Sequence, residues 1–171
     1  EETVNIFLVE DEPWALEELA VLMKVYEPDH SIFSFESSDE ALASIHTVRP
    51  DLVITDIRMP GMDGFEMVKR MKESCPDLQA IVLSGYDEFK YARQGLRLGI
   101  KDYLLKPVRR NTLYETVERV LKTICAIKQQ RKKQDEWTLT RLLLGTGEYL
   151  EGSSTALLPG RWCIILLVCE N

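Results

Sequence analysis

The 171-residue sequence is poor in cysteine and has no long apolar run. Its four cysteines, Cys75, Cys125, Cys163 and Cys169, form no Cys-x-x-Cys pair and no zinc-ligand spacing, which favours free thiols in a reducing compartment. The longest apolar run, Cys163 to Cys169, is far too short to span a bilayer. No signal-peptide pattern opens the sequence, so we expect a cytoplasmic protein without a membrane segment.

The chain also lacks an excess of positive charge. Its net charge of −7 argues against binding of nucleic acid or an anionic membrane by these residues alone. A hydrophobic content of 45% is enough for a core, and the length suits one domain with an additional segment.

Strand and helix patterns alternate through the first part of the chain. Apolar, often β-branched runs predict strands at residues 4–9, 31–35, 51–55, 80–84 and 102–105. Apolar stripes predict helices at 13–26, from 37–39 through 45, from 64, from 87 and from about 110. This alternation predicts an α/β fold, a doubly wound parallel sheet of five strands with helices on both faces.

The last of these helices does not end where a domain-covering helix would. Its apolar residues follow 4-3-4-3 spacing at Leu113, Val117, Val120, Ile124 and Ile127. This spacing is typical of a coiled-coil seam, but it also fits the core face of an ordinary last helix. Lys128 to Glu136 has no apolar position, so we expect a solvated helical linker that does not pack on the domain. A DNA-contacting basic stripe is the less favoured interpretation of that linker.

These patterns predict three parts. Residues 1–127 form the α/β domain, 128–144 a helical linker, and 145–171 the start of an incomplete second domain. The third prediction depends on the loop-rich sequence after Gly145 and on the single apolar strand from Trp162 to Val168, which cannot build a core alone.

Polar residues follow four of the five predicted strands. Glu10 and Asp11 follow the first strand, Asp56 the third and Lys106 the fifth, and Ser84 ends the fourth. Carboxyl ends of parallel strands share one edge of the sheet, which is where ligands bind in such folds. Each residue alone is more simply a surface polar group, but their coincidence at one edge favours a site.

The chemistry of this set is coherent. Carboxylates of Glu10, Asp11 and Asp56 would repel one another unless a cation lay between them, and oxygen ligands without Cys or His suit Mg²⁺. Lys106 adds a point charge for a phosphate or carboxylate oxygen, and Ser84 adds a hydroxyl donor. The set therefore predicts phosphoryl transfer to Asp56 as the nucleophile.

Three stretches resemble the receiver domain of two-component response regulators. They are FLVEDEP (Phe7 to Pro13), DLVITDIRMPGMDGFE (Asp51 to Glu66) and VLSGYDEFKYARQGLRLGIKDYLLKP (Val82 to Pro107). The resemblance covers about Val4 to Ile127 and implies a flavodoxin-like sheet in the order 2-1-3-4-5. It also implies that a sensor histidine kinase donates the phosphoryl group to Asp56.

The resemblance assigns further roles at the metal site. Asp11 is implied as a direct Mg²⁺ ligand beside Asp56, Glu10 as a second acid acting through water, and Arg58 as a ligand through its backbone carbonyl. Glu10 stands where Asp is commoner in the family, which could change the water shell of the metal.

It assigns a switch as well. Ser84 matches the switch hydroxyl, Tyr103 the switch aromatic and Lys106 the phosphate-binding lysine, and the bond before Pro107 is expected to be cis. We expect the side chains of Arg58 and Tyr86 to shield the phosphoryl group and lengthen its lifetime.

The region from Ser84 to Pro107 and the long linker also resemble regulators with an AraC-type helix-turn-helix output. DNA binding would then reside in a domain missing from this chain, and the linker seam predicts a parallel dimer matching paired DNA half-sites. The protein would be no enzyme beyond its own phosphorylation and dephosphorylation. Two alternatives are a haloacid-dehalogenase-like phosphatase, disfavoured because Arg58 replaces its second Asp, and a receiver that switches partners without phosphorylation.

Overall fold

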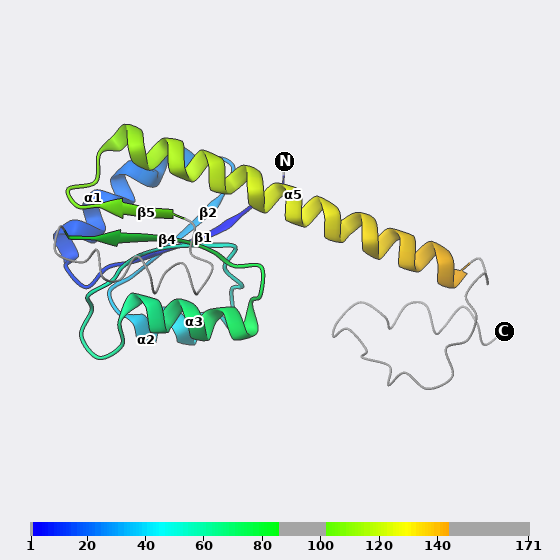
Figure 1. Ribbon diagram of the computed structural model, residues 1–171, viewed down its shortest axis with the longest axis horizontal. Coiled ribbons are helices and arrows are strands. Elements are labelled where there is room, and N and C mark those ends of the chain that lie inside the picture. Colours follow the sequence, from blue (N-terminus) through cyan, green and yellow to red (C-terminus); the bar gives the residue numbers. More distant parts are fainter. Residues whose placement is uncertain (1, 86–101, 144–171) are drawn as a thin grey trace. The chain divides into compact units, whose positions relative to one another are not determined.

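The computed structural model describes residues 2–85 and 102–143, and five parallel strands form its single sheet (Figure 1). The strands are β1 (Asn5–Val9), β2 (Ser31–Phe35), β3 (Leu52–Asp56), β4 (Gln79–Ser84) and β5 (Asp102–Leu105). Their order is β2-β1-β3-β4-β5, and every neighbouring pair is parallel. The predicted fold class and strand order are confirmed.

Helices cover both faces of the sheet (Figure 1). They are α1 (Pro13–Met23), continued by a short 3₁₀ turn (Lys24–Tyr26), α2 (Ser38–Ser44), α3 (Gly64–Ser74) and α5 (Arg110–Leu143). α1 and α5 lie on one face, and α2 and α3 on the other. The helix predicted from residue 87 lies outside the described residues.

Alternation along β1 shows how the sequence builds two cores. Ile6 and Leu8 are fully buried in the cluster that includes residues of α1 and α5. Phe7 and Val9 are fully buried in the opposite cluster, which includes residues of α2 and α3. Successive side chains of a strand point to opposite faces, so a continuous apolar run is the pattern that a doubly covered strand requires.

The apolar seam of α5 belongs to the domain itself. Leu113, Val117, Val120 and Ile124 are all buried in the core cluster shared with α1. The core-face interpretation of these positions is therefore confirmed. This part of the seam is not available to a second helix.

The linker expectation was wrong at two residues. Lys128 Nζ lies 2.7 Å from Asp51 Oδ2 and 3.0 Å from the carbonyl oxygen of Thr3. Arg131 pairs with Asp77 at 2.5 Å. Long basic side chains reach the domain although their helix positions are not apolar, which the hydrophobic pattern could not reveal. From Lys132 to Thr138 the side chains are exposed, as expected.

Contacts within the chain define a compact unit from Glu1 to Arg131 and a second from Lys132 to Asn171. The division at residues 127 and 128 stays a prediction, as does the incomplete domain at 145–171, which lies outside the described residues. Among residues 2–85 and 102–143, none of the helices combines the length and apolar character that a bilayer span needs.

Candidate functional site

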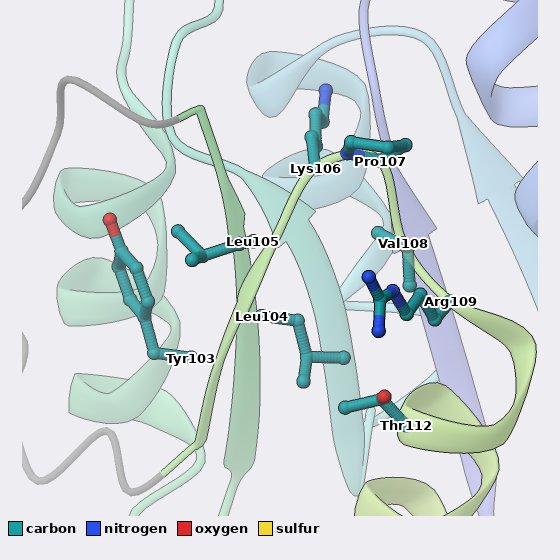
Figure 2. Close-up of a pocket in the computed structure, with 8 residues that line it drawn as sticks. All are labelled: Tyr103, Leu104, Leu105, Lys106, Pro107, Val108, Arg109 and Thr112. Atoms are coloured by element: carbon teal, nitrogen blue, oxygen red, sulfur yellow. The ribbon is translucent and has the colours of Figure 1, made fainter.

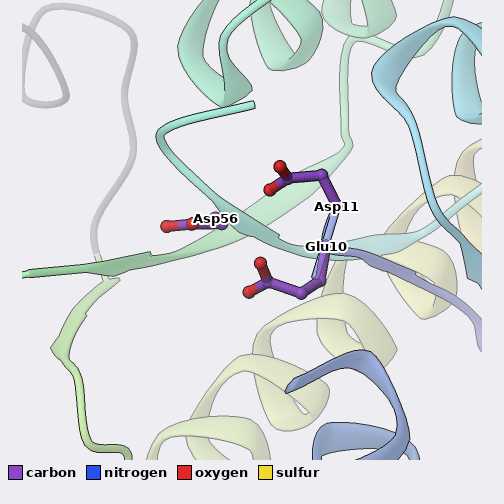
Figure 3. Close-up of side chains that lie close together, drawn as sticks. All are labelled: Glu10, Asp11 and Asp56. Carbon is purple, nitrogen blue, oxygen red and sulfur yellow. The ribbon is translucent and has the colours of Figure 1, made fainter. Parts of the chain in front are cut away.

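Three carboxylates meet where β1 and β3 end (Figure 3). Glu10 and Asp11 directly follow β1, and Asp56 is the last residue of β3. One carboxylate oxygen from each lies within 4.8 Å of the others. Glu10 is only 1% exposed, so its negative charge is held in a largely water-free position. The sequence placed these acids on one edge, and the structure brings them together.

Lys106 joins two of these acids. Its Nζ lies 2.7 Å from Glu10 Oε2 and 2.9 Å from Asp56 Oδ2. β4 stands between β3 and β5, so the lysine reaches back across the sheet edge from the end of β5. The peptide bond between Lys106 and Pro107 is cis, as predicted.

Burial and charge shape the protonation of this cluster. Burial, reinforced by the nearby charge of Asp56, raises the pKa of Glu10 despite the hydrogen bond from Lys106. Burial alone would lower the pKa of Lys106, but its contacts with Glu10 and Asp56 outweigh burial and raise that pKa. Lys106 is therefore a firmly charged ammonium at neutral pH.

Asp56 is held from several directions. The backbone N–H of Ile57 donates to its Oδ1 at 2.7 Å, and Lys106 contacts its Oδ2. The hydroxyl of Thr55 donates to the carbonyl oxygen of Asp56 at 2.9 Å. At the start of α3, a Cβ on Gly64 would lie 2.1 Å from that same carbonyl oxygen. Glycine is required there because the backbone at the start of α3 lies so close to the backbone of Asp56.

Ser84 and Tyr103 lie at the other side of the site. Ser84 is fully buried, and its hydroxyl contacts the hydroxyl of Tyr103. Tyr103 and Leu104 project to opposite sides of β5, with Lys106 at the strand end (Figure 2). The backbone N–H of Lys106 donates to the carbonyl oxygen of Ser84 at 2.7 Å, which ties the ends of β4 and β5 together.

The structure describes only one of the two residues that are predicted to lengthen the lifetime of the phosphoryl group. Arg58 is exposed in the β3–α3 loop, two residues after Asp56. Tyr86 lies outside the described residues. The predicted metal-ligand, switch and lifetime roles of individual residues stay predictions.

Sequence reasoning missed two residues that support the site. The apolar pattern marks residue 64 only as the start of a helix, although a glycine directly after the loop that follows Asp56 is a signal of close backbone approach. The sequence pattern indicates only a helix start at residues 37–39, but the buried hydroxyl of Ser38 contacts the β3–α3 loop. No sequence signal could have found that contact, which joins residues 24 positions apart.

The donor set fits a small, hard divalent cation. The three acids offer only oxygen atoms, and no His or Cys joins this group among the described residues. Mg²⁺ takes a few carboxylates and completes its shell with water or phosphate oxygens. Glu10, Asp11 and Asp56 are the residues that would hold it, and it would neutralise charge developing on phosphoryl oxygens.

Comparison with known proteins identifies the family. Residues 6–118 match the response regulator receiver domain. The chain is 36% identical over 118 residues to the uncharacterized transcriptional regulatory protein YesN of Bacillus subtilis, covering 68% of this chain and 32% of YesN. It is 36% identical over 122 residues to the positive alginate biosynthesis regulatory protein of Pseudomonas aeruginosa, covering 68% of this chain and 46% of that protein.

Solved structures agree with the fold. A crystal structure of an uncharacterized protein from Neptuniibacter caesariensis superposes with a TM-score of 0.68 at 30% identity, over 74% of this chain and 93% of that chain. The crystal structure of a putative response regulator from Chloroflexus aurantiacus has a TM-score of 0.63 at 25% identity. The match covers 71% of this chain and 99% of that chain. The chain belongs to the response regulator receiver domain family, and it spans less than half the length of the two regulators named above.

Proposed function

We propose that this receiver domain accepts a phosphoryl group on Asp56 in a Mg²⁺-dependent reaction with a sensor histidine kinase. The observation that carries the proposal is the position of Lys106, whose ammonium contacts Asp56 at 2.9 Å and Glu10 at 2.7 Å. Asp56 therefore lies beside two further carboxylates and the ammonium of Lys106. In-line phosphoryl transfer to a carboxylate needs such an arrangement.

In the proposed reaction, an oxygen of Asp56 attacks the phosphorus of a phosphohistidine. The phosphorus–oxygen bond forms as the phosphorus–nitrogen bond breaks, and the electron pair of that bond stays with the histidine ring. Lys106 holds the carboxylate and then a phosphoryl oxygen by its charge, and the hydroxyl of Ser84 donates to another. The backbone N–H of Ile57 keeps Asp56 oriented throughout.

The product would bias a two-state switch. The phosphoryl group places nearly two negative charges beside Lys106 and Ser84, where the carboxylate of Asp56 carried one. Drawing the Ser84 hydroxyl to the phosphoryl group would break its contact with Tyr103 and favour a different packing of the aromatic side chain. A shift from mostly off to mostly on needs roughly 5 kcal/mol of differential stabilisation. In this proposal the domain catalyses only its own phosphorylation and dephosphorylation.

Two regulators to which the chain is similar are named for transcription or biosynthesis control. We infer that the full-length protein controls transcription through a DNA-binding region beyond residues 1–171, of AraC type by the resemblance above. A homodimer through α5 and the linker stays part of this proposal, although Leu113, Val117 and Ile124 of the seam are buried in the core of their own domain.

Intact-mass spectrometry tests the phosphoryl chemistry. The wild type, Asp56→Asn and Asp51→Asn are each incubated with acetyl phosphate and Mg²⁺. Asp51→Asn is the control, because it changes an acid next to the opposite end of β3. We expect a gain of about 80 Da, one phosphate, in the wild type and Asp51→Asn only, abolished by chelating Mg²⁺. No gain in the wild type would refute the proposal. Steady turnover of p-nitrophenyl phosphate would instead indicate a phosphatase.

A further inference from the structure

Ser38 is a buried polar residue that contacts the loop following Asp56. It is the first residue of α2 and is only 2% exposed. Its hydroxyl donates to the backbone carbonyl oxygen of Met62 at 2.8 Å and lies 3.8 Å from the sulfur of Met59. Both contacts are with the loop between β3 and α3. A buried hydroxyl without such partners would be costly, so this contact is a specific part of the fold.

The contacted loop follows Asp56 directly and carries Arg58, whose carbonyl is the predicted metal ligand. The ends of the loop are held locally, because Gly64 N–H donates to the carbonyl oxygen of Ile57 at 2.9 Å. Gly61 turns the loop with a φ of +79°, and Met59 is buried in the core. Ser38, which belongs to α2, adds a hydrogen bond to the loop at Met62, directly after this turn. The hydroxyl therefore ties the loop to α2 rather than to its own flanks.

Ser37 and Ser38 divide two tasks between neighbouring hydroxyls. Ser37 is the N-cap of α2, since its Oγ accepts from the backbone N–H of Glu40 at 3.3 Å. Ser38 makes no cap bond of this kind and turns its hydroxyl to Met62 instead. Stability of α2 and position of the loop can thus be changed separately.

We propose that Ser38 is a positioning residue for the metal and phosphoryl site, acting through the β3–α3 loop. The inference rests on the proposed function. Removing the hydroxyl takes away this bond to the Met62 carbonyl, so the loop that follows Asp56 and carries Arg58 is held less firmly at the site. Residues that orient metal ligands typically change metal affinity by tenfold or more when removed.

The test compares Ser38→Ala with Ser37→Ala, each beside the wild type. Mg²⁺ affinity is measured by titration calorimetry, and hydrogen exchange of residues 57–63 is measured without metal. We expect Ser38→Ala to weaken Mg²⁺ binding about tenfold and to speed exchange in the loop. Ser37→Ala is expected to leave both unchanged while lowering the stability of α2. Ser38→Cys keeps a weak donor of similar shape, and it is measured as well in case Ser38→Ala does not fold.

The outcomes separate the two proposals. Equal Mg²⁺ affinity and equal loop exchange in the wild type and the Ser38 variants would overturn the role of Ser38 and leave the proposed function intact. Equal weakening in the Ser37 and Ser38 variants would also overturn it, because the effect would then come from α2. Absence of Mg²⁺ binding in the wild type would overturn the proposed function together with this inference.

Discussion

The ammonium nitrogen of Lys106 lies 2.7 Å from Oε2 of Glu10, across 96 residues of sequence. The same nitrogen contacts Asp56, so one lysine partly neutralises the carboxylate cluster. A divalent cation would be attracted by the same oxygens and repelled by this lysine.

Replacing the lysine tests that relationship. We expect Lys106→Met to bind Mg²⁺ more tightly, by roughly tenfold or about 1.4 kcal/mol, because a positive charge near the metal is removed. Phosphorylation by acetyl phosphate should nevertheless become slower. Titration calorimetry measures the affinity, with Lys69→Met on the exposed side of α3 as the matched control. Weaker Mg²⁺ binding in Lys106→Met would contradict the expected competition.

The contact between Ser84 and Tyr103 leads to a second prediction. Tyr103→Phe keeps the ring but removes the hydroxyl that engages Ser84. In the wild type, Ser84 gives up this hydrogen bond, worth about 1 kcal/mol, when it turns to the phosphoryl group. The variant has no such bond to give up. We expect phosphorylation by acetyl phosphate to become about fivefold faster. Tyr114→Phe is the control, since its hydroxyl donates to the carbonyl oxygen of Leu22 at 2.9 Å, away from the site. Slower phosphorylation of Tyr103→Phe would show that the hydroxyl assists the reaction.

Two glycines that follow Asp56 in the sequence, Gly61 and Gly64, differ in what a side chain would meet. Gly64→Ala places a Cβ 2.1 Å from the carbonyl oxygen of Asp56, whereas Gly61→Ala places one in open space at a φ of +79°. We expect Gly64→Ala to lower the free energy of unfolding by about 3 kcal/mol and Gly61→Ala by about 1 kcal/mol. Urea unfolding measures both. The reverse order would mean that the backbone at Gly64 relaxes without difficulty.

At the opposite edge of the sheet, Lys128 fastens α5 to Asp51 at 2.7 Å. Both side chains are partly buried, with exposed fractions of 27% and 19%, so the pair is less screened than a surface pair. We expect Lys128→Ala to lower the free energy of unfolding by about 1 kcal/mol. Hydrogen exchange near residues 125–131 should become faster. Lys132→Ala, four residues further along α5 and exposed, is the control. Equal effects of both variants would mean that the ion pair with Asp51 adds nothing.

Local pattern determined much of this protein. The strand at Asp102–Leu105, the start of α5 at Arg110 and the cap of α2 at Ser37 follow from residues within a few positions of one another. The alternating order of strands and helices then restricts the topology to a parallel sheet, because right-handed crossovers leave few arrangements. Placing Glu10, Asp11, Asp56, Ser84 and Lys106 at one edge required no more than that topology.

Only the tertiary structure decided which surfaces meet. The seam of α5 fits a partner helix or the domain's own core equally well by spacing, and its burial against α1 made the choice. Lys128 reaches Asp51, and Ser38 reaches Met62, through contacts between distant residues that leave no periodic trace in the sequence. Periodicity reports that a face is buried, whereas the identity of its neighbour depends on how the whole chain packs.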